Sequence, residues 1–235
     1  MDDLFEKAVV IIDGSFIIHR VYHATRPNID TGFRVANNRF KTIANSHPDC
    51  DINIVFDKGG CEYRKGLNPY YKANRPLLPD VFYTFQKSII DQQLEGNSTV
   101  YISKGIEGDD LIASVKKLKG VNCNVYIYTR DKDIFQLIDD HCFIIDPFEY
   151  QVFDKEKCKE KHGVYPEKIW FKLCLMGDKA DGIAGIPSVG NSTAISLANK
   201  YDTLEDLLEG EKWIEPYRNM LYLNKQLVCL RDDVI

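Results

Sequence analysis

The sequence of 235 residues lacks several features that define common protein classes. It has no apolar run of membrane-spanning length, so we expect no membrane association. The first residues, MDDLFEKAVVIIDG, contain neither a basic segment nor a small-residue cleavage site, which argues against a secretory signal. No GxGxxG or GxxxxGKS/T motif follows the first apolar run, so the mark of a nucleotide-binding α/β domain is missing.

The seven cysteines include no CxxC pair and are scattered along the chain. An odd, dispersed set does not suit a disulfide framework or a zinc site, so we interpret them as reduced thiols of a cytoplasmic, intracellular protein. The formal net charge of −5 argues mildly against a nucleic-acid partner. That argument fails if many carboxylates gather at one metal site, because such a cluster repels phosphate only until cations occupy it.

Short apolar runs rich in β-branched and aromatic residues predict buried strands at 8–12, 52–56, 99–102 and 125–128. Helical patterns at 111–118 and near 81–94 lie between them, and this alternation predicts an α/β fold with a mostly parallel sheet flanked by helices. Residues 142–145 and 151–153 are typical of short peripheral strands. From about residue 155 only helices are expected, at 166–176, 191–200 and 203–208. We therefore predict an α/β body over residues 1–154 and a smaller helical region over residues 155–235.

Acidic residues follow each of the four predicted central strands. Asp13 follows the first, Asp57 the second, and Asp131 with Asp133 the fourth, while the third leads to EGDD at residues 107–110. Ligands of open α/β sheets bind outside the carboxyl ends of the strands, so these acids are expected at one edge. Solvation in loops, or a favourable helix start for EGDD, would explain any one of them. The whole set would require four such coincidences.

Carboxylates without histidine or thiolate partners favour hard cations such as Mg²⁺ or Mn²⁺. Two such ions about 4 Å apart can activate a water molecule and stabilise the leaving oxygen in phosphodiester cleavage. Two further acids, Asp178 and Asp181, have the spacing of residues on one face of a helix end or turn. The Gly-rich segment GIAGIPSVGNSTA follows and leads into a helix, so its N–H groups could bind phosphate. A plain turn between packed helices is the alternative.

The segment RKGLNPYYKANR, at residues 64–75, is basic and aromatic. Its cations could contact phosphates, and Tyr70 or Tyr71 could stack on a base. A solvated face is the usual explanation of such a run. Its place shortly after Asp57 brings it near the predicted acidic edge, which favours the binding role.

Nearly the whole chain resembles the 5′-nuclease or flap endonuclease superfamily, through DGSFIIHR, FDKGGCEYR, YYKANR, EGDDLIASV, TRDKDIFQLI, MGDKADGI and GIPSVGNSTA in that order. The likeness is strongest to stand-alone phage flap endonucleases and to the 5′-nuclease domain of bacterial DNA polymerase I. The resemblance implies a PIN-like body, a helical arch at about 64–95 and a duplex-binding helix–three-turn–helix at about 178–197.

The resemblance also implies a function. The protein would be a structure-specific 5′-nuclease, a 5′-3′ exonuclease or flap endonuclease of DNA replication and repair, leaving 5′-phosphate and 3′-hydroxyl ends. Two or three Mg²⁺ or Mn²⁺ ions are the implied cofactors, with K⁺ at the hairpin. The implied partners are branched or 5′-ended DNA and RNA-primed ends. The enzyme would act as a monomer, associated with the nucleoid if the source is bacterial or phage.

Site residues are implied at the positions that match the family motifs. The first metal site would use Asp13, Asp57, Glu107, Asp109 and Asp110. The second would use Asp131, Asp133, Asp178 and Asp181. Catalytic roles are implied for Lys72 and Arg75, which would reach the scissile phosphate, and for Asp13, Asp57 and Asp109. DNA contacts are implied for Arg20, Arg64, Tyr71, Gly185, Ser188, Gly190, Ser192 and Thr193, and K⁺ contacts for Ile186, Ser188 and Val189.

Two features depart from the family pattern. The family hairpin carries a lysine just after its last glycine, where this chain has Asn191, Ser192 and Thr193. Duplex binding is therefore expected to be weaker, or to use Lys200 and backbone amides. The chain also ends at RDDVI, whereas longer relatives carry further helices.

Two other functions stay open at this point. A PIN-type ribonuclease would share the body and the first acidic site, but it would not need Asp178, Asp181 or the hairpin. A non-catalytic binder of branched DNA would have lost arch or metal residues, and the presence of Lys72 and of all the acids argues against it.

Overall fold

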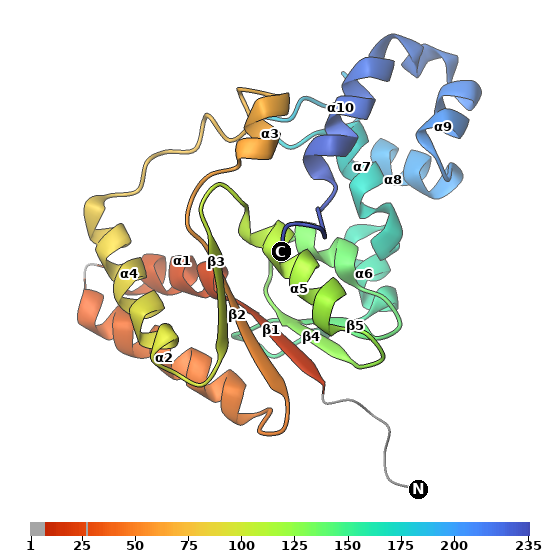
Figure 1. The fold of residues 1–235 in the computed structure, drawn as a ribbon. Helices are drawn as coiled ribbons and strands as arrows, with labels where there is room; N and C mark the ends of the chain where they lie inside the picture. The colour runs from red at the N-terminus through yellow and green to blue at the C-terminus, as the bar shows by residue number, and fades with distance from the viewer. Residues whose placement is uncertain (1–7, 27) are drawn as a thin grey trace, which may run out of the picture.

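The structure is a computed structural model that describes residues 8–26 and 28–235. The expected absence of a secretory signal concerns residues that lie largely outside this range. At the centre is a six-stranded sheet in the order β3-β2-β1-β4-β5-β6 (Figure 1). Its strands are β1 (Val9–Asp13), β2 (Asp51–Asp57), β3 (Thr99–Ser103), β4 (Val125–Tyr128), β5 (Cys142–Ile145) and β6 (Val152–Phe153). Neighbouring strands are parallel except β5 and β6, so the predicted mostly parallel sheet is confirmed.

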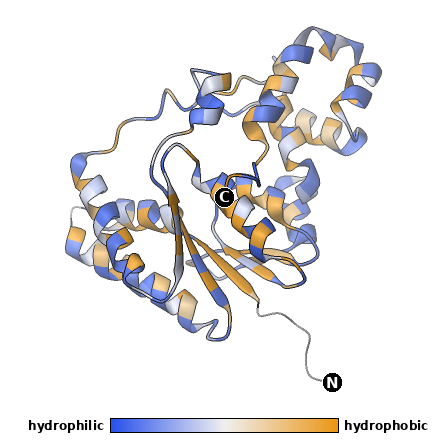
Figure 2. Cartoon of the chain, in the orientation of Figure 1, coloured by the Kyte–Doolittle hydropathy of each residue, from blue (hydrophilic) through white to orange (hydrophobic). Residues whose placement is uncertain are grey.

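Helices cover both faces of the sheet, which explains why the strands are continuous apolar runs. In β1, Val10 and Ile12 point into one core while Val9 and Ile11 point into the other. The hydropathy colouring shows apolar strands inside and polar residues along the outer helical surfaces (Figure 2). The first core is covered by α1 (Gly14–Thr25), α2 (Ile29–Asn45) and α4 (Asp80–Leu94), and the second by α5 (Gly108–Lys119).

The second half of the chain is helical and extends the core under α5. Pro166 begins a 3₁₀ turn before the α-helix proper, a position where its missing N–H leaves no hydrogen bond unmade. No helix in the described part of the chain is both long and apolar enough to cross a membrane. The elements are α6 (Lys155–His162), η2 (Pro166–Lys168), α7 (Ile169–Met176), α8 (Asn191–Lys200), α9 (Leu204–Gly210), η3 (Lys212–Tyr217) and α10 (Arg218–Val228).

The last helix, α10, returns to the first half of the chain. It packs on α7 and also contacts α3 (Glu62–Leu67), the short helix that follows β2 (Figure 1). Asn224 of α10 is buried and donates hydrogen bonds to the carbonyls of Cys174, at 2.9 Å, and Ala184, at 2.7 Å. This one side chain therefore ties α10 to the end of α7 and to the loop after it.

We expect Asn224→Ala to lower the free energy of unfolding by roughly 2 kcal/mol, because two carbonyls lose a buried donor. Urea denaturation followed by circular dichroism measures the change. The matched control is Asn219→Ala, an exposed asparagine on the same helix, which should stay close to the parent. Equal stability of the Asn224 variant and the parent would show that these hydrogen bonds do not hold α10 in place.

Candidate metal centre

The topology of the sheet brings the predicted acids to one edge. Asp13 and Asp57 are the last residues of the adjacent strands β1 and β2. Asp131 follows β4, which flanks β1 on its other side. Asp109 and Asp110 lie in the first turn of α5, directly after the loop that leaves β3. The strands β2 and β3 lie on one side of β1, and β4 to β6 lie on its other side. Open α/β sheets bind ligands at such a switch in strand order, here between β1 and β4.

Two groups of carboxylates at this edge have the geometry to hold a metal ion. One comprises Asp109, Asp131 and Asp133, and the other comprises Asp133, Asp178 and Asp181. Within each group, one oxygen from each residue lies within 4.8 Å of the others. Asp133 belongs to both groups, and its Oδ1 atom is buried without a hydrogen-bond partner. An unpartnered carboxylate oxygen among other carboxylates fits a hard divalent cation.

These groups divide the acids differently from the two sites expected from the sequence. Asp109 gathers with Asp131 and Asp133 instead of with Asp13 and Asp57. Asp13 caps α1, because its Oδ1 accepts from the Phe16 N–H and its Oδ2 from the Thr129 hydroxyl, both at 2.8 Å. The Oδ1 of Asp57 accepts from the Gly59 N–H. Asp13 nevertheless interacts electrostatically with Asp131 of the first group, and Asp57 interacts with Glu107.

Burial and mutual repulsion make these carboxylates hard to ionise in the absence of cations. Desolvation, followed by the charge of Asp131, raises the pKa of Asp133 to about 7. Desolvation likewise raises the pKa of Asp13 to about 7, against hydrogen bonds that lower it. The pKa of Asp109 is raised well above its usual value, again by burial first and then by Asp131 and Asp13. Such an edge attracts cations strongly.

Side-chain cations from two loops already pair with the outer acids. Lys72 contacts Glu107, Arg75 contacts Asp181, and Lys132 contacts Asp178. Lys132 was not predicted as a site residue, although its place between two acids in RDKD was an available signal. Burial alone would raise the pKa of Asp178, but the hydrogen bond and charge of Lys132 outweigh it, and the pKa is lowered.

The loop that carries Lys72 and Arg75 is fixed by backbone contacts. Lys72 has a φ of +53°, unusual for a side-chain-bearing residue, and its N–H donates to the Asp181 carbonyl at 2.8 Å. Gly182 lies under the same loop with a φ of +71°, and a Cβ there would be 2.7 Å from the Tyr70 carbonyl. The segment around Asp181 therefore sets the position of both basic side chains.

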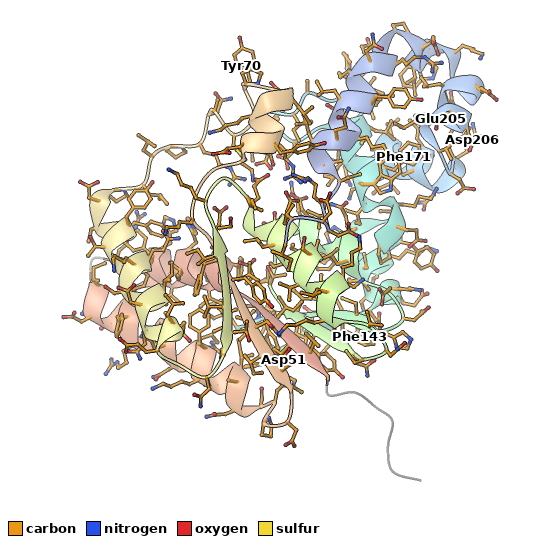
Figure 3. The ribbon with its side chains drawn as sticks, in the orientation of Figure 1. Asp51, Tyr70, Phe143, Phe171, Glu205 and Asp206 are labelled. Carbon is orange, nitrogen blue, oxygen red and sulfur yellow. The ribbon has the colours of Figure 1, made fainter. Side chains whose placement is uncertain are left out.

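Three predicted site residues are placed differently from expectation. Arg64 is only 3% exposed and binds Glu107 and Asp110, so it cannot reach a phosphate. Asp110 gives both oxygens to Arg64, at 2.6 and 2.8 Å, and belongs to neither metal-holding group. Tyr71 is also 3% exposed and donates to Glu107, so it cannot stack on a base. Tyr70 is 77% exposed and points outward (Figure 3).

The hairpin between α7 and α8 presents backbone to solvent. Gly190 caps α8 with no side-chain hydrogen bond, which leaves the first N–H groups of that helix available to an anion. Ile186 and Val189 are buried, and the Ile186 carbonyl accepts a hydrogen bond from the Val189 N–H. One of the two lone pairs of that oxygen is therefore already engaged. Of the residues predicted to contact DNA, Ser188, Gly190, Ser192 and Thr193 are exposed here, Gly185 is half-buried, and Arg20 is exposed on α1.

Family models and curated relatives of this chain are 5′-3′ exonucleases or DNA polymerase I. A family model described as the N-terminal resolvase-like domain of 5′-3′ exonuclease matches residues 8–163, and one described as its C-terminal SAM fold matches residues 164–235. The 5′-3′ exonuclease of Aquifex aeolicus is 32% identical over 97% of this chain and 83% of its own length. DNA polymerase I of Pseudomonas aeruginosa is 31% identical over 97% of this chain, which spans only 28% of that polymerase.

Solved structures share the fold. The T5 5′-exonuclease with bound divalent zinc superposes with a TM-score of 0.83 at 20% identity, covering 94% of this chain and 89% of the other. The T5 D15 flap endonuclease in a pseudo-enzyme–product complex with DNA and metal ions gives a TM-score of 0.81 at 20% identity, with the same coverage of each chain. The predicted fold class, an α/β body followed by a helical part, is thereby confirmed.

The raised pKa values predict how the stability of the metal-free protein depends on pH. The folded state keeps protons on Asp133 and Asp13 that the unfolded chain releases near pH 4, so the free energy of unfolding falls as pH rises from 4 to about 7. In chelator, Asp133→Asn should therefore be more stable than the parent at pH 8, and the difference should shrink towards pH 5. Thermal melts across this range measure it, with exposed Asp49→Asn as control. Parallel pH profiles for the parent and the Asp133 variant would contradict the raised pKa of Asp133.

Proposed function

Because this chain belongs to the 5′-3′ exonuclease family, we propose that it is a structure-specific 5′-nuclease acting on branched or 5′-ended DNA. It hydrolyses phosphodiester bonds with two divalent cations and leaves 5′-phosphate and 3′-hydroxyl ends. One observation carries the proposal: two carboxylate groups share Asp133 at the sheet edge, beneath the loop that bears Lys72 and Arg75. The polymerase relative is much longer, so the proposal covers the nuclease reaction alone.

The donor set supports two adjacent cations. Asp109, Asp131 and Asp133 would hold one, and Asp133, Asp178 and Asp181 would hold the other, so Asp133 would contribute to both. Their all-oxygen character favours Mg²⁺ or Mn²⁺. When bound, such ions lower the pKa of a coordinated water and neutralise charge on the phosphate. Asp13 and Asp57 add negative charge next to the groups and strengthen cation binding.

Lys72 and Arg75 would act on the opposite side of the scissile phosphate. In this structure each pairs with a carboxylate of the cluster, Lys72 with Glu107 and Arg75 with Asp181. Asp181 belongs to one of the metal-holding groups, so a cation held there would compete for it with Arg75 and with Lys72, whose Nζ lies 3.9 Å from Asp181. Both side chains would then be freer to meet a phosphate. A cation preorganised there stabilises the negative charge that develops on the non-bridging oxygens as water attacks.

Duplex binding is proposed for the hairpin and the start of α8, together with Arg20 on α1. The unpartnered N–H groups beginning at Asn191 suit a DNA phosphate. The alternative that Lys200 replaces the missing family lysine is less favoured, because Lys200 pairs with Glu211 at 2.8 Å. K⁺ at the carbonyls near Ser188 and RNA-primed ends as substrates remain part of the proposal.

The function is tested with a 5′-labelled DNA flap. We expect cleavage in Mg²⁺ or Mn²⁺, none in excess chelator, and binding without cleavage in Ca²⁺, because Ca²⁺ tolerates a looser coordination shell than Mg²⁺. An RNA flap separates the DNA nuclease from a ribonuclease, and the contribution of Asp178 and Asp181 to one carboxylate group disfavours the latter. Full cleavage in chelator would refute the metal mechanism. Tight flap binding with no cleavage in Mg²⁺ or Mn²⁺ would instead support a non-catalytic binder.

Lys72→Ala is expected to lower the single-turnover rate of flap cleavage about a hundredfold, equivalent to about 3 kcal/mol, because a preorganised cation is lost in the transition state. Binding in Ca²⁺ should fall only modestly. Lys117→Ala, an exposed lysine on α5 far along the chain from the loop, serves as the matched control. A Lys72 variant within about threefold of the parent rate would show that Lys72 does not stabilise the transition state.

A further inference from the structure

Arg64 is a buried cation at the junction of three parts of the chain. It belongs to α3, directly after β2. Its Nη1 donates to Glu107 at 2.5 Å and to Asp110 at 2.6 Å, and its Nη2 donates to the other Asp110 oxygen at 2.8 Å. Its Nε donates to the Leu227 carbonyl at 2.8 Å, and Nη2 also reaches the Cys229 carbonyl at 3.0 Å. The guanidinium thus binds the start of α5 and the end of α10 at once.

The burial of this group excludes an ordinary surface role. The side chains of Arg64, Glu107 and Asp110 are each 4–5% exposed. A buried guanidinium is tolerated only where its N–H groups are satisfied, and here planar bidentate geometry with Asp110 and two carbonyls satisfies them. Lysine could not reproduce this pattern, because an ammonium group lacks the planar fork.

The partner Asp110 is held from the C-terminal side as well. Its Oδ1 accepts from the backbone N–H of Arg231 at 3.0 Å, in addition to Arg64. Further along the same segment, the Val234 N–H donates to the Ser114 hydroxyl of α5 at 3.1 Å. The segment that leaves α10 is therefore attached along the first turns of α5, the helix that carries Asp109.

Glu107 is where this network meets the metal centre. Its Oε2 accepts from Arg64, while its Oε1 faces Lys72. With Oε2 fixed by a buried cation, the other oxygen has a defined direction towards the loop and the carboxylate cluster. Arg64 is thus placed to orient Glu107 and the start of α5, although it touches neither a metal-holding group nor any exposed surface.

We propose that Arg64 is a positioning residue for the metal centre and that Asp110 is its structural partner instead of a metal ligand. Through this pair, the end of α10 sets the orientation of Glu107 and Asp109. The inference rests on the proposed two-cation nuclease function. Residues that orient metal ligands from behind typically affect metal affinity 10- to 100-fold when changed.

The test measures Mn²⁺ binding by calorimetry without DNA. We expect Arg64→Lys to bind as many Mn²⁺ ions as the parent, about tenfold more weakly, because the charge stays and the fork geometry is lost. The matched control is Arg218→Lys, which changes an exposed arginine paired with Glu215 and should not alter Mn²⁺ affinity. Unchanged or tighter binding in Arg64→Lys would overturn the proposal, since a charge effect alone would leave this variant like the parent. A lower melting temperature with unchanged affinity would overturn it as well.

Asp110→Asn separates the two roles of the carboxylate. If Asp110 only pairs with Arg64, we expect Asp110→Asn to bind as many Mn²⁺ ions as the parent. Loss of one bound ion would show that Asp110 is a metal ligand and would refute the proposal. If a single variant fails to fold, Arg64→Gln combined with Asp110→Asn removes both charges and avoids leaving one buried and unpaired. This double variant should still bind Mn²⁺ about tenfold more weakly than the parent, and parent-like affinity would again overturn the proposal.

These measurements also distinguish the inference from the function on which it rests. A parent protein that binds Mn²⁺ but cleaves no DNA flap, with Arg64→Lys weakened in Mn²⁺ binding, would defeat the proposed nuclease and leave the positioning role standing. A parent that cleaves flaps, with Arg64→Lys unchanged in Mn²⁺ affinity, would support the nuclease and refute the positioning role of Arg64.

Discussion

Mutual repulsion among the carboxylates at the sheet edge is the constraint to which the rest of the structure responds. Parallel strands end at the same side, so the topology that gathers Asp13, Asp57 and Asp131 also forces their charges together. The fold limits the cost in two ways. Some acids hold their protons more tightly because they are buried, as Asp133 does. Others are matched by cations from neighbouring segments, as Glu107 is by Arg64 and Lys72.

The same constraint explains the conformation of the loop after α3. Lys72 adopts a left-handed backbone conformation that costs free energy, and its N–H bonds to the Asp181 carbonyl. The attraction between the basic loop and the acidic edge offsets that cost. Any change that neutralises the edge, such as binding of divalent cations, therefore alters the balance that holds the loop. The basic loop and the acidic edge are thus linked through this shared set of charges.

Much of the fold follows from the sequence because its signals are local. Continuous β-branched runs identify the central strands, and an acid directly after each run predicts the acidic edge. The helices α1 and α2 were not predicted individually: α1 begins at the residue after β1, and its start is a motif whose glycine and serine do not signal a helix. The division of the chain near residue 155 stays a prediction.

The site was predictable in membership but not in internal arrangement. Which acids lie together depends on side-chain directions across three separate segments, so the membership of Asp133 in both groups could not be inferred from spacing. In the basic segment at 64–75, a DNA contact was predicted for Arg64, which is in fact buried and paired. A buried, fully paired Arg64 and an exposed phosphate-binding arginine have the same sequence signature, and only the packing of α10 separates them.

The reach of Arg64 along the chain has a consequence for how the protein is made. Its carbonyl partners, Leu227 and Cys229, lie 163 and 165 residues later in the sequence. Chains emerge from the ribosome starting at the N-terminus, and earlier parts fold first. The strands that supply the acids are therefore synthesised long before the backbone that completes the surroundings of Arg64. A nascent chain has all the acids of the sheet edge while the backbone that completes the surroundings of Arg64 is still missing, and the finished acidic edge appears only after α10 has been translated.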